Sequence, residues 1–277
     1  MLSLIASMIF ALARVGEGAA ESDWYKYISY LLPQISFAAA CLIYFRRSKQ
    51  PVREVYRPAK WYYFLIALTL QFGLLFSLNF LNEYFVKFLE LFGYHASMND
   101  TIPDLSGWNL LPAILVIALL PAIFEETLMR GCVLGSMERS GWGTVSAVLV
   151  SGALFSLFHG NPEQTIYQFL CGAAFALLAL RSGSILPGMM AHFLNNAVIL
   201  IMTSCGADPS ALPLGGEIAL YVLSGVCLVG SLGLLLFEKR NVRGGVREGK
   251  QFFLAASVGM LVCAVEWIGA LVGGFSA

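Results

Sequence analysis

Three short motifs between residues 125 and 196 place ionisable and amide side chains inside apolar sequence. They are Glu125-Glu-Thr-Leu-Met-Arg130, Phe155-Ser-Leu-Phe-His159 and His192-Phe-Leu-Asn-Asn196. Ionisable groups at membrane depth cost at least about 2.5–3.5 kcal/mol each on insertion scales, and they are tolerated when they pair or line a polar cavity. Hydrolysis of a peptide bond needs a base for the attacking water and donors for the oxyanion. The motifs supply both kinds of group.

The first motif separates two acids by role. On a helix Glu126 and Arg130 are i,i+4 neighbours with the acid on the N-terminal side, which is the favourable orientation for an ion pair. Glu125 points roughly 100° away from Glu126. We therefore expect Glu126 and Arg130 to support the helix and Glu125 to carry the chemistry. Pro121, one turn earlier, is expected to kink the helix and to free a backbone carbonyl that protein or water must satisfy.

The other two motifs supply the remaining groups of a hydrolytic site. His159 shares a helix face with Phe155, and His192 shares one with Asn196, because each pair is spaced i,i+4. We expect Glu125 and His159 to hold and deprotonate a water molecule. We expect His192 and Asn196 to donate hydrogen bonds to the oxyanion.

The elements that position these residues are predicted to be membrane-spanning helices. The chain has 277 residues, of which 58% are hydrophobic and 12% charged, and its mean hydropathy is +0.75. Its net charge of zero gives no indication of a nucleic-acid partner. Apolar runs predict an all-α polytopic membrane protein of about eight transmembrane helices, with a further short, retained helix in residues 1–20. The predicted spans are 24–45, 61–82, 109–137, 141–158, 164–180, 184–203, 217–237 and 251–275.

The distribution of basic residues predicts the orientation of these spans. Loops 46–60 and 238–250 are rich in Lys and Arg, so we expect both on the cytoplasmic side. The polar and aromatic connection 83–108 has few basic residues and is expected outside. We treat 1–277 as one integral membrane domain with N-terminal helices in 1–108, a catalytic core in 109–200 and C-terminal helices in 217–277. The membrane would be the plasma membrane in a prokaryote or the endoplasmic reticulum in a eukaryote.

The motifs also resemble those of a known family. EExxxR, FxxxH and HxxxN occur in this order in the CAAX protease and bacteriocin-processing (CPBP) family of intramembrane proteases, which includes the type II CAAX prenyl endopeptidases. The resemblance covers about residues 109 to 200. It implies an intramembrane endopeptidase with catalytic Glu125, His159, His192 and Asn196, supported by Glu126, Arg130 and Phe155. The implied partners are membrane lipids and a peptide or lipidated, CAAX-like protein substrate.

Two questions stay open at the level of sequence. The first is metal dependence. Glu125, His159 and His192 would be enough ligands for a catalytic zinc ion, but HExxH is absent and we expect no cofactor. The second is activity itself. The alternatives are a non-catalytic immunity or scaffold protein that keeps the same motifs, and a proton-coupled transporter, which would typically show repeated halves.

Overall fold

The protein is described by a computed structural model covering residues 22–95, 102–239, 241 and 250–275. Every regular element in these residues is helical. The α-helices before the central helix are α2 (Asp23–Ser48), α3 (Val52–Val55), α4 (Tyr62–Ser77) and α5 (Asn79–Glu90). Those after it are α9 (Thr144–Phe158), α10 (Thr165–Ser182), α11 (Leu186–Cys205), α12 (Leu214–Phe237) and α13 (Lys250–Gly274). The prediction of an all-α protein is confirmed.

The helices suit a polytopic membrane protein. Among the described residues, six helical segments are long and apolar enough to cross a bilayer: Asp23–Ser48, Tyr62–Glu90, Gly107–Arg139, Pro162–Ser182, Leu186–Cys205 and Leu214–Phe237. The remaining two predicted spans form shorter apolar helices, Thr144–Phe158 and Gly259–Gly274 within α13. The predicted short helix in residues 1–20 lies outside the described residues.

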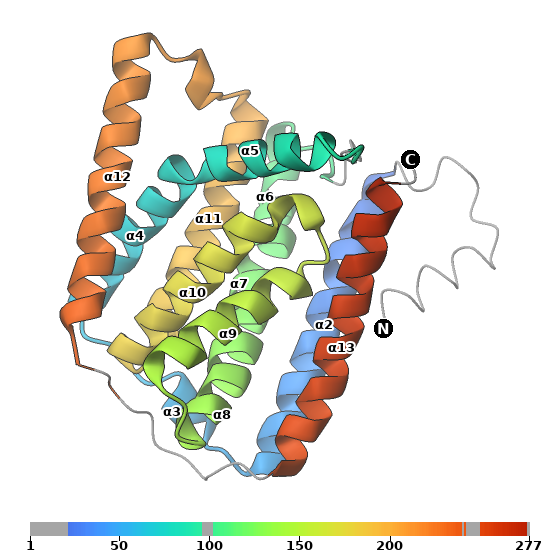
Figure 1. Cartoon of the computed structure of the whole chain (residues 1–277), viewed down its shortest axis with the longest axis vertical. Coiled ribbons are helices and arrows are strands. Elements are labelled where there is room, and N and C mark those ends of the chain that lie inside the picture. The colour runs from blue at the N-terminus through green and yellow to red at the C-terminus, as the bar shows by residue number, and fades with distance from the viewer. Residues whose placement is uncertain (1–21, 96–101, 240, 242–249, 276–277) are drawn as a thin grey trace, which may run out of the picture.

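The predicted loop 83–108 is partly helical instead. After α4 the chain bends at Leu78 and continues as α5 to Glu90, which crosses one end of the bundle in Figure 1. One side of α5 is exposed and aromatic, since Tyr84 and Phe88 are more than half exposed. The sequence prediction missed this helix because its polar residues were interpreted as the end of a span.

The central helix runs from Gly107 to Arg139 and contains two π-helical segments. It contains α6 (Leu110–Ala113), the π-helical segment η3 (Ile114–Leu119), α7 (Leu120–Glu126), the π-helical segment η4 (Thr127–Val133) and α8 (Leu134–Arg139). Segments of π-helix are frequent at functional sites, because they shift side chains relative to a regular helix. Both adjacent acids lie at the end of α7, between the two π segments.

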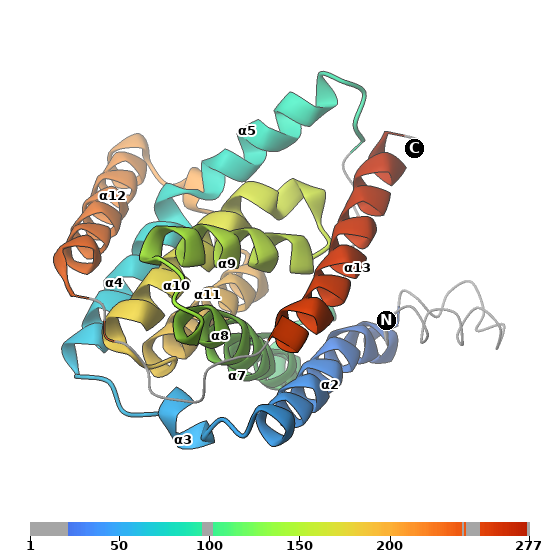
Figure 2. The ribbon, with the colours of Figure 1, turned by 60° about the horizontal axis from the view of Figure 1, so that its bottom comes forward.

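The central helix and its neighbours form the middle of the bundle. In Figures 1 and 2, α7 to α11 lie between α4 and α12 on one side and α2 and α13 on the other. One apolar core joins α4, α10, α11 and α12, with Leu70, Phe175 and Leu235 among its fully buried members. A second joins the start of the central helix to α11 through Ile117 and Leu200. These cores hold α11 beside α7, so their polar side chains can meet.

The length of helix α9 affects where His159 lies relative to the two acids. If it spanned the membrane from residue 141, His159 would lie at the outer surface, far from the acids. The helix begins at Thr144 and has 15 residues. At about 1.5 Å per residue it is roughly 22 Å long, less than the ~30 Å hydrocarbon core. His159, which follows its last residue, lines the same cavity as Glu125 and His192.

Candidate active site

Glu125 is held between two helices. Its Oε1 accepts a hydrogen bond of 3.0 Å from Nε2 of Gln34 on α2. Its Oε2 lies 4.0 Å from Nε2 of His192 on α11. That separation is too long for a direct hydrogen bond and is suited to a bridging water. The carboxylate is 8% exposed, and its residue lines the cavity described below. One oxygen is thus fixed by protein and the other is available for chemistry.

Glu126 contacts Arg130 and His192. Its Oε1 accepts from Arg130 at 2.8 Å and from Nδ1 of His192 at 3.0 Å. Glu126 and Arg130 are fully buried, so the ion pair lies in a dry environment. Because a carboxylate can only accept, Nδ1 of His192 carries its proton and Nε2 faces Glu125. Glu126 therefore has a role beyond the expected ion pair, since it also fixes the orientation of His192.

Phe155 packs against the guanidinium of Arg130. The guanidinium carbon lies 4.4 Å from the centre of the Phe155 ring, and the same arginine donates to the carbonyl of Gly172 at 3.0 Å. A Cβ on Gly172 would lie 2.8 Å from the Cβ of Phe155. Glycine at position 172 therefore lets α9 approach α10 closely enough for these contacts. The apolar residue of the second motif thus stabilises the cation of the first.

His159 is oriented by its own helix. Its Nδ1 lies 2.7 Å from the carbonyl oxygen of Phe155, and its ring packs edge-on against the Phe155 ring at 4.6 Å between centres. A carbonyl can only accept, so Nδ1 carries the proton and the neutral ring has its lone pair on Nε2. His159 can therefore accept a hydrogen bond or a proton in the cavity that it lines.

Asn196 satisfies the backbone at the proline of the central helix. Its Nδ2 donates to the carbonyl of Ile117 at 3.0 Å. Ile117 lies in the π-helical segment η3, shortly before Pro121, which has no N–H. A backbone carbonyl near Pro121 thus accepts a hydrogen bond from a side chain of another helix. The amide of Asn196 has a second N–H, so one donor remains for a ligand.

A chain of amides fixes which way Asn196 points. Its Oδ1 accepts from Asn195 Nδ2 at 3.0 Å. The Oδ1 of Asn195 accepts from Gln71 on α4 and from the hydroxyl of Tyr167 on α10, each at 2.7 Å. With its oxygen engaged, Asn196 must present its nitrogen to Ile117 and the cavity. Three helices therefore cooperate to orient one amide.

A cavity of about 760 Å³ joins the four expected catalytic residues: Glu125, His159, His192 and Asn196. From there it extends to residues at the ends of helices, among them Gly206, Asp208 and Tyr221. No Lys or Arg is among its lining residues within the described part of the chain. The lining of the cavity thus combines amides, aromatic rings and aliphatic side chains with two carboxylates.

The suggested dependence on zinc stays a prediction. Within residues 22–95, 102–239, 241 and 250–275, no group of three His, Cys, Asp or Glu side chains could hold a metal ion. Glu125, His159 and His192 line one cavity without converging on one point. No step proposed below depends on a metal.

Sequence reasoning missed three groups of this site, namely Gln34, Gln71 and the Tyr167–Asn195 pair. Gln34 and Gln71 are amide residues near the middle of predicted apolar spans. A buried polar residue in a span marks function or helix contact in the same way as an ionisable one. The two buried amides are thus visible in the sequence. Their hydrogen-bond partners could not be identified from it, because the partner of Gln34 lies 91 positions away and that of Gln71 lies 124 positions away.

The comparisons agree with the resemblance in the motifs. Residues 107–198, about a third of the chain, match the model of a family described as type II CAAX prenyl endopeptidase Rce1-like. No curated protein and no solved structure matches the chain. The family resemblance is confirmed over this segment, which contains all three motifs and the whole central helix. The match supports an integral membrane protease.

Proposed function

Because residues 107–198 resemble type II CAAX prenyl endopeptidases, we propose that this protein is a glutamate-dependent intramembrane endopeptidase. The observation that carries the proposal is the position of Glu125 Oε2, 4.0 Å from His192 Nε2 in a cavity that His159 and Asn196 also line. A carboxylate base, an imidazole acceptor and two donors then surround the space where a peptide bond and a water molecule can meet.

The chemical step begins with water hydrogen-bonded to Glu125 Oε2 in the cavity that His159 also lines. The water oxygen attacks the scissile carbonyl carbon, and its proton passes to the carboxylate of Glu125. The carbonyl oxygen becomes an oxyanion in the tetrahedral intermediate. When the C–N bond breaks, Glu125 returns the proton to the leaving amine, and the carboxylate is regenerated.

His192 and Asn196 stabilise the oxyanion in this proposal. Asn196 has one N–H that Ile117 does not use. His192 donates through Nε2 when its ring is protonated, and the carboxylate of Glu126 at Nδ1 stabilises that imidazolium. Donors fixed in place before the reaction are worth several kcal/mol to acyl transfer, about 2.7–4 for a single donor.

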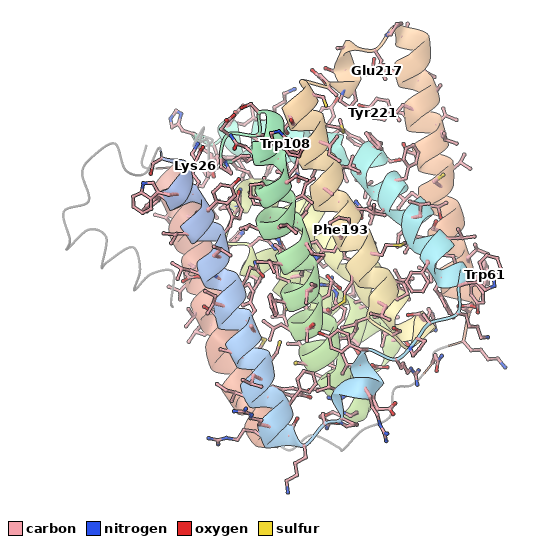
Figure 3. The ribbon with its side chains drawn as sticks, turned by 180° about the vertical axis from the view of Figure 1, so that it is seen from behind. Lys26, Trp61, Trp108, Phe193, Glu217 and Tyr221 are labelled. Carbon is pink, nitrogen blue, oxygen red and sulfur yellow. The ribbon has the colours of Figure 1, made fainter. Side chains whose placement is uncertain are left out.

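The position of the cavity favours substrates from the non-cytoplasmic side. Its far end is lined by Gly206, Asp208 and Tyr221. Figure 3 shows Tyr221 toward the same end of the bundle as Lys26 and Trp108, and α3 at the other end. α3 belongs to the basic loop 46–60, for which we propose a cytoplasmic position. The substrate is then a membrane-associated peptide cleaved at an internal bond, since no Lys or Arg of the described residues lines the cavity to bind a free C-terminal carboxylate.

Cleavage of defined peptides tests the proposal. Purified protein in detergent is incubated with fluorogenic peptides that are prenylated or unmodified, each with a free or an amidated C-terminus. We expect hydrolysis of at least one peptide and no requirement for a free C-terminus. If wild-type protein cleaves none, or if none of the cleavage is lost in the Glu125→Gln variant, the chain is better described as a scaffold or immunity protein.

Thiol labelling tests the side on which the cavity opens. Cys205 is exposed at the end of α11, one residue before the cavity-lining Gly206. A membrane-impermeant maleimide added to intact cells is expected to label wild-type protein through Cys205. A Cys205→Ser, Arg53→Cys variant should react only after permeabilisation, and Cys205→Ser alone gives the background. Labelling in the reverse pattern would place the cavity mouth in the cytoplasm and favour a lipidated cytoplasmic tail.

Chelation tests the expected independence from metal. Dialysis against EDTA and phenanthroline is expected to leave the cleavage rate within about twofold of untreated protein, since Glu125 acts as base without a Lewis acid. A peptide cleaved by a known zinc protease serves as the positive control for chelation. Loss of activity that zinc restores would contradict the glutamate-only mechanism.

A further inference from the structure

Gln34 lies outside the segment that matches the family, yet it contacts the proposed base. It is on α2, 91 residues before Glu125, and donates to Oε1 of Glu125 at 3.0 Å. The Gln34 side chain is almost fully enclosed, with 4% of its residue surface exposed, and it lines the same cavity as Glu125 and His159.

The register of α2 along the central helix is set at two points. Gln34 contacts Glu125, and ten residues later the hydroxyl of Tyr44 lies 2.9 Å from Oγ of Ser136. The two contacts are 11 residues apart on the central helix, from 125 to 136, and 10 apart on α2, from 34 to 44. The two helices therefore run parallel with nearly equal rise. The contact between Gln34 and Glu125 is therefore built into the helix packing.

The other end of the same amide has no partner. Oε1 of Gln34 is buried and accepts no hydrogen bond from any described residue. Its nitrogen is committed to Glu125, which can only accept, so the amide cannot be turned to exchange the two atoms. A buried acceptor without a donor is unfavourable. In a cavity that also contains a proposed base, such an atom indicates a ligand with an O–H or N–H.

We propose that Gln34 completes the binding site of the attacking water. Its Nε2 fixes Oε1 of Glu125 so that Oε2 faces the cavity, and its Oε1 accepts one O–H of the water while Oε2 of Glu125 takes the proton of the other. The lone pairs of the water oxygen are then directed at the substrate. This inference rests on the proposed function. It adds to the family-like core a residue from a helix outside that core.

Replacing Gln34 by Met tests the proposal, because Met has similar length and no amide. We expect kcat to fall by about 10- to 100-fold, the effect of misplacing a reacting group by about an ångström. KM and the affinity for an uncleaved peptide on the Glu125→Gln background should change by less than about threefold. Ile35→Met, a substitution at the neighbouring, exposed position of α2, should leave the rate unchanged.

A double-mutant cycle distinguishes water positioning from a general packing defect. On the Glu125→Gln background, Gln34→Met should cause no further loss of the residual rate, because holding the water in place has no effect once the base that takes its proton is absent. Gln71→Met removes another buried amide that contacts Asn195 instead, so its loss should persist on that background. If Gln34→Met folds poorly, the shorter amide of Gln34→Asn keeps the polarity and provides the same comparison.

The outcomes are separable from those of the proposed function. If wild-type protein cleaves no peptide, the protease proposal fails. If wild-type protein cleaves but Gln34→Met and Gln34→Asn keep at least half of its rate, the inference about Gln34 is wrong and the protease proposal stands. The inference is also wrong if either variant weakens peptide affinity as strongly as it lowers kcat, because Gln34 would then bind substrate.

Discussion

Glu125→Gln is expected to lower peptide cleavage by roughly 10²–10⁴-fold or more, the range for loss of a positioned general base. The variant should fold at least as well as wild type, because a neutral amide is easier to bury than a carboxylate. The amide oxygen introduced by the substitution can still accept from Gln34 Nε2, so the contact between α2 and the central helix is kept. Loss of turnover without loss of folding is the signature of a catalytic group.

The measurement pairs thermal melting in detergent with single-turnover cleavage of the best peptide from the panel. Binding of the same peptide to the variant, followed by fluorescence anisotropy, should be as tight as binding to wild type. A variant that melts much earlier and still cleaves would remove Glu125 from the mechanism. A variant with wild-type cleavage would favour the interpretation of the motifs as a scaffold.

Glu126→Gln is expected to destabilise the protein, by about 3–5 kcal/mol if Arg130 is left as an uncompensated buried charge. Arg130 and Glu126 are both fully buried, so water cannot replace the lost partner. The same change removes the carboxylate from Nδ1 of His192. Cleavage should therefore fall as well, because a neutral amide stabilises the imidazolium less than a carboxylate does. This double effect separates Glu126 from Glu125, whose replacement should affect turnover alone.

A compensating change distinguishes the two effects of Glu126. In the Glu126→Gln, Arg130→Met variant both charges are absent, and removal of a whole buried ion pair is often close to neutral for stability. The melting temperature should recover toward that of wild type while cleavage stays reduced. Full recovery of both would mean that Glu126 serves the ion pair alone and that its contact with His192 has no part in catalysis.

The geometry also bears on the alternative functions. The polar network of Gln71, Tyr167, Asn195 and Asn196 ends at the carbonyl of Ile117 and at the cavity. A scaffold would need these residues for packing alone, and their replacement would then lower stability without a change in kcat. A proton relay would need groups that connect both ends of the bundle. The cavity instead extends from the proposed site toward the end that contains Asp208.

The sequence by itself determined the spanning helices and the membrane setting. Apolar runs of more than about 17 residues have few alternatives to a spanning helix, because every backbone polar group must be satisfied internally in lipid. The central helix, its proline and the i,i+4 spacing of Glu126 with Arg130 were predictable for the same reason: they depend on contacts within one helix. The family resemblance came from motifs that are likewise local.

Only the tertiary structure decided how groups on different helices meet. The contacts of Gln34 with Glu125, of Glu126 with His192 and of Asn196 with Ile117 join residues 66 to 91 positions apart. They depend on the rotation and depth of each helix. The place of His159 depends likewise on the length of α9, and the packing of Phe155 on the close approach that Gly172 permits. Periodicity fixes which face of a helix a side chain occupies, whereas packing between helices decides what that face contacts. For this reason the motifs indicated the chemistry, but the second contact of Glu126 and the place of Gln34 became visible only in the folded chain.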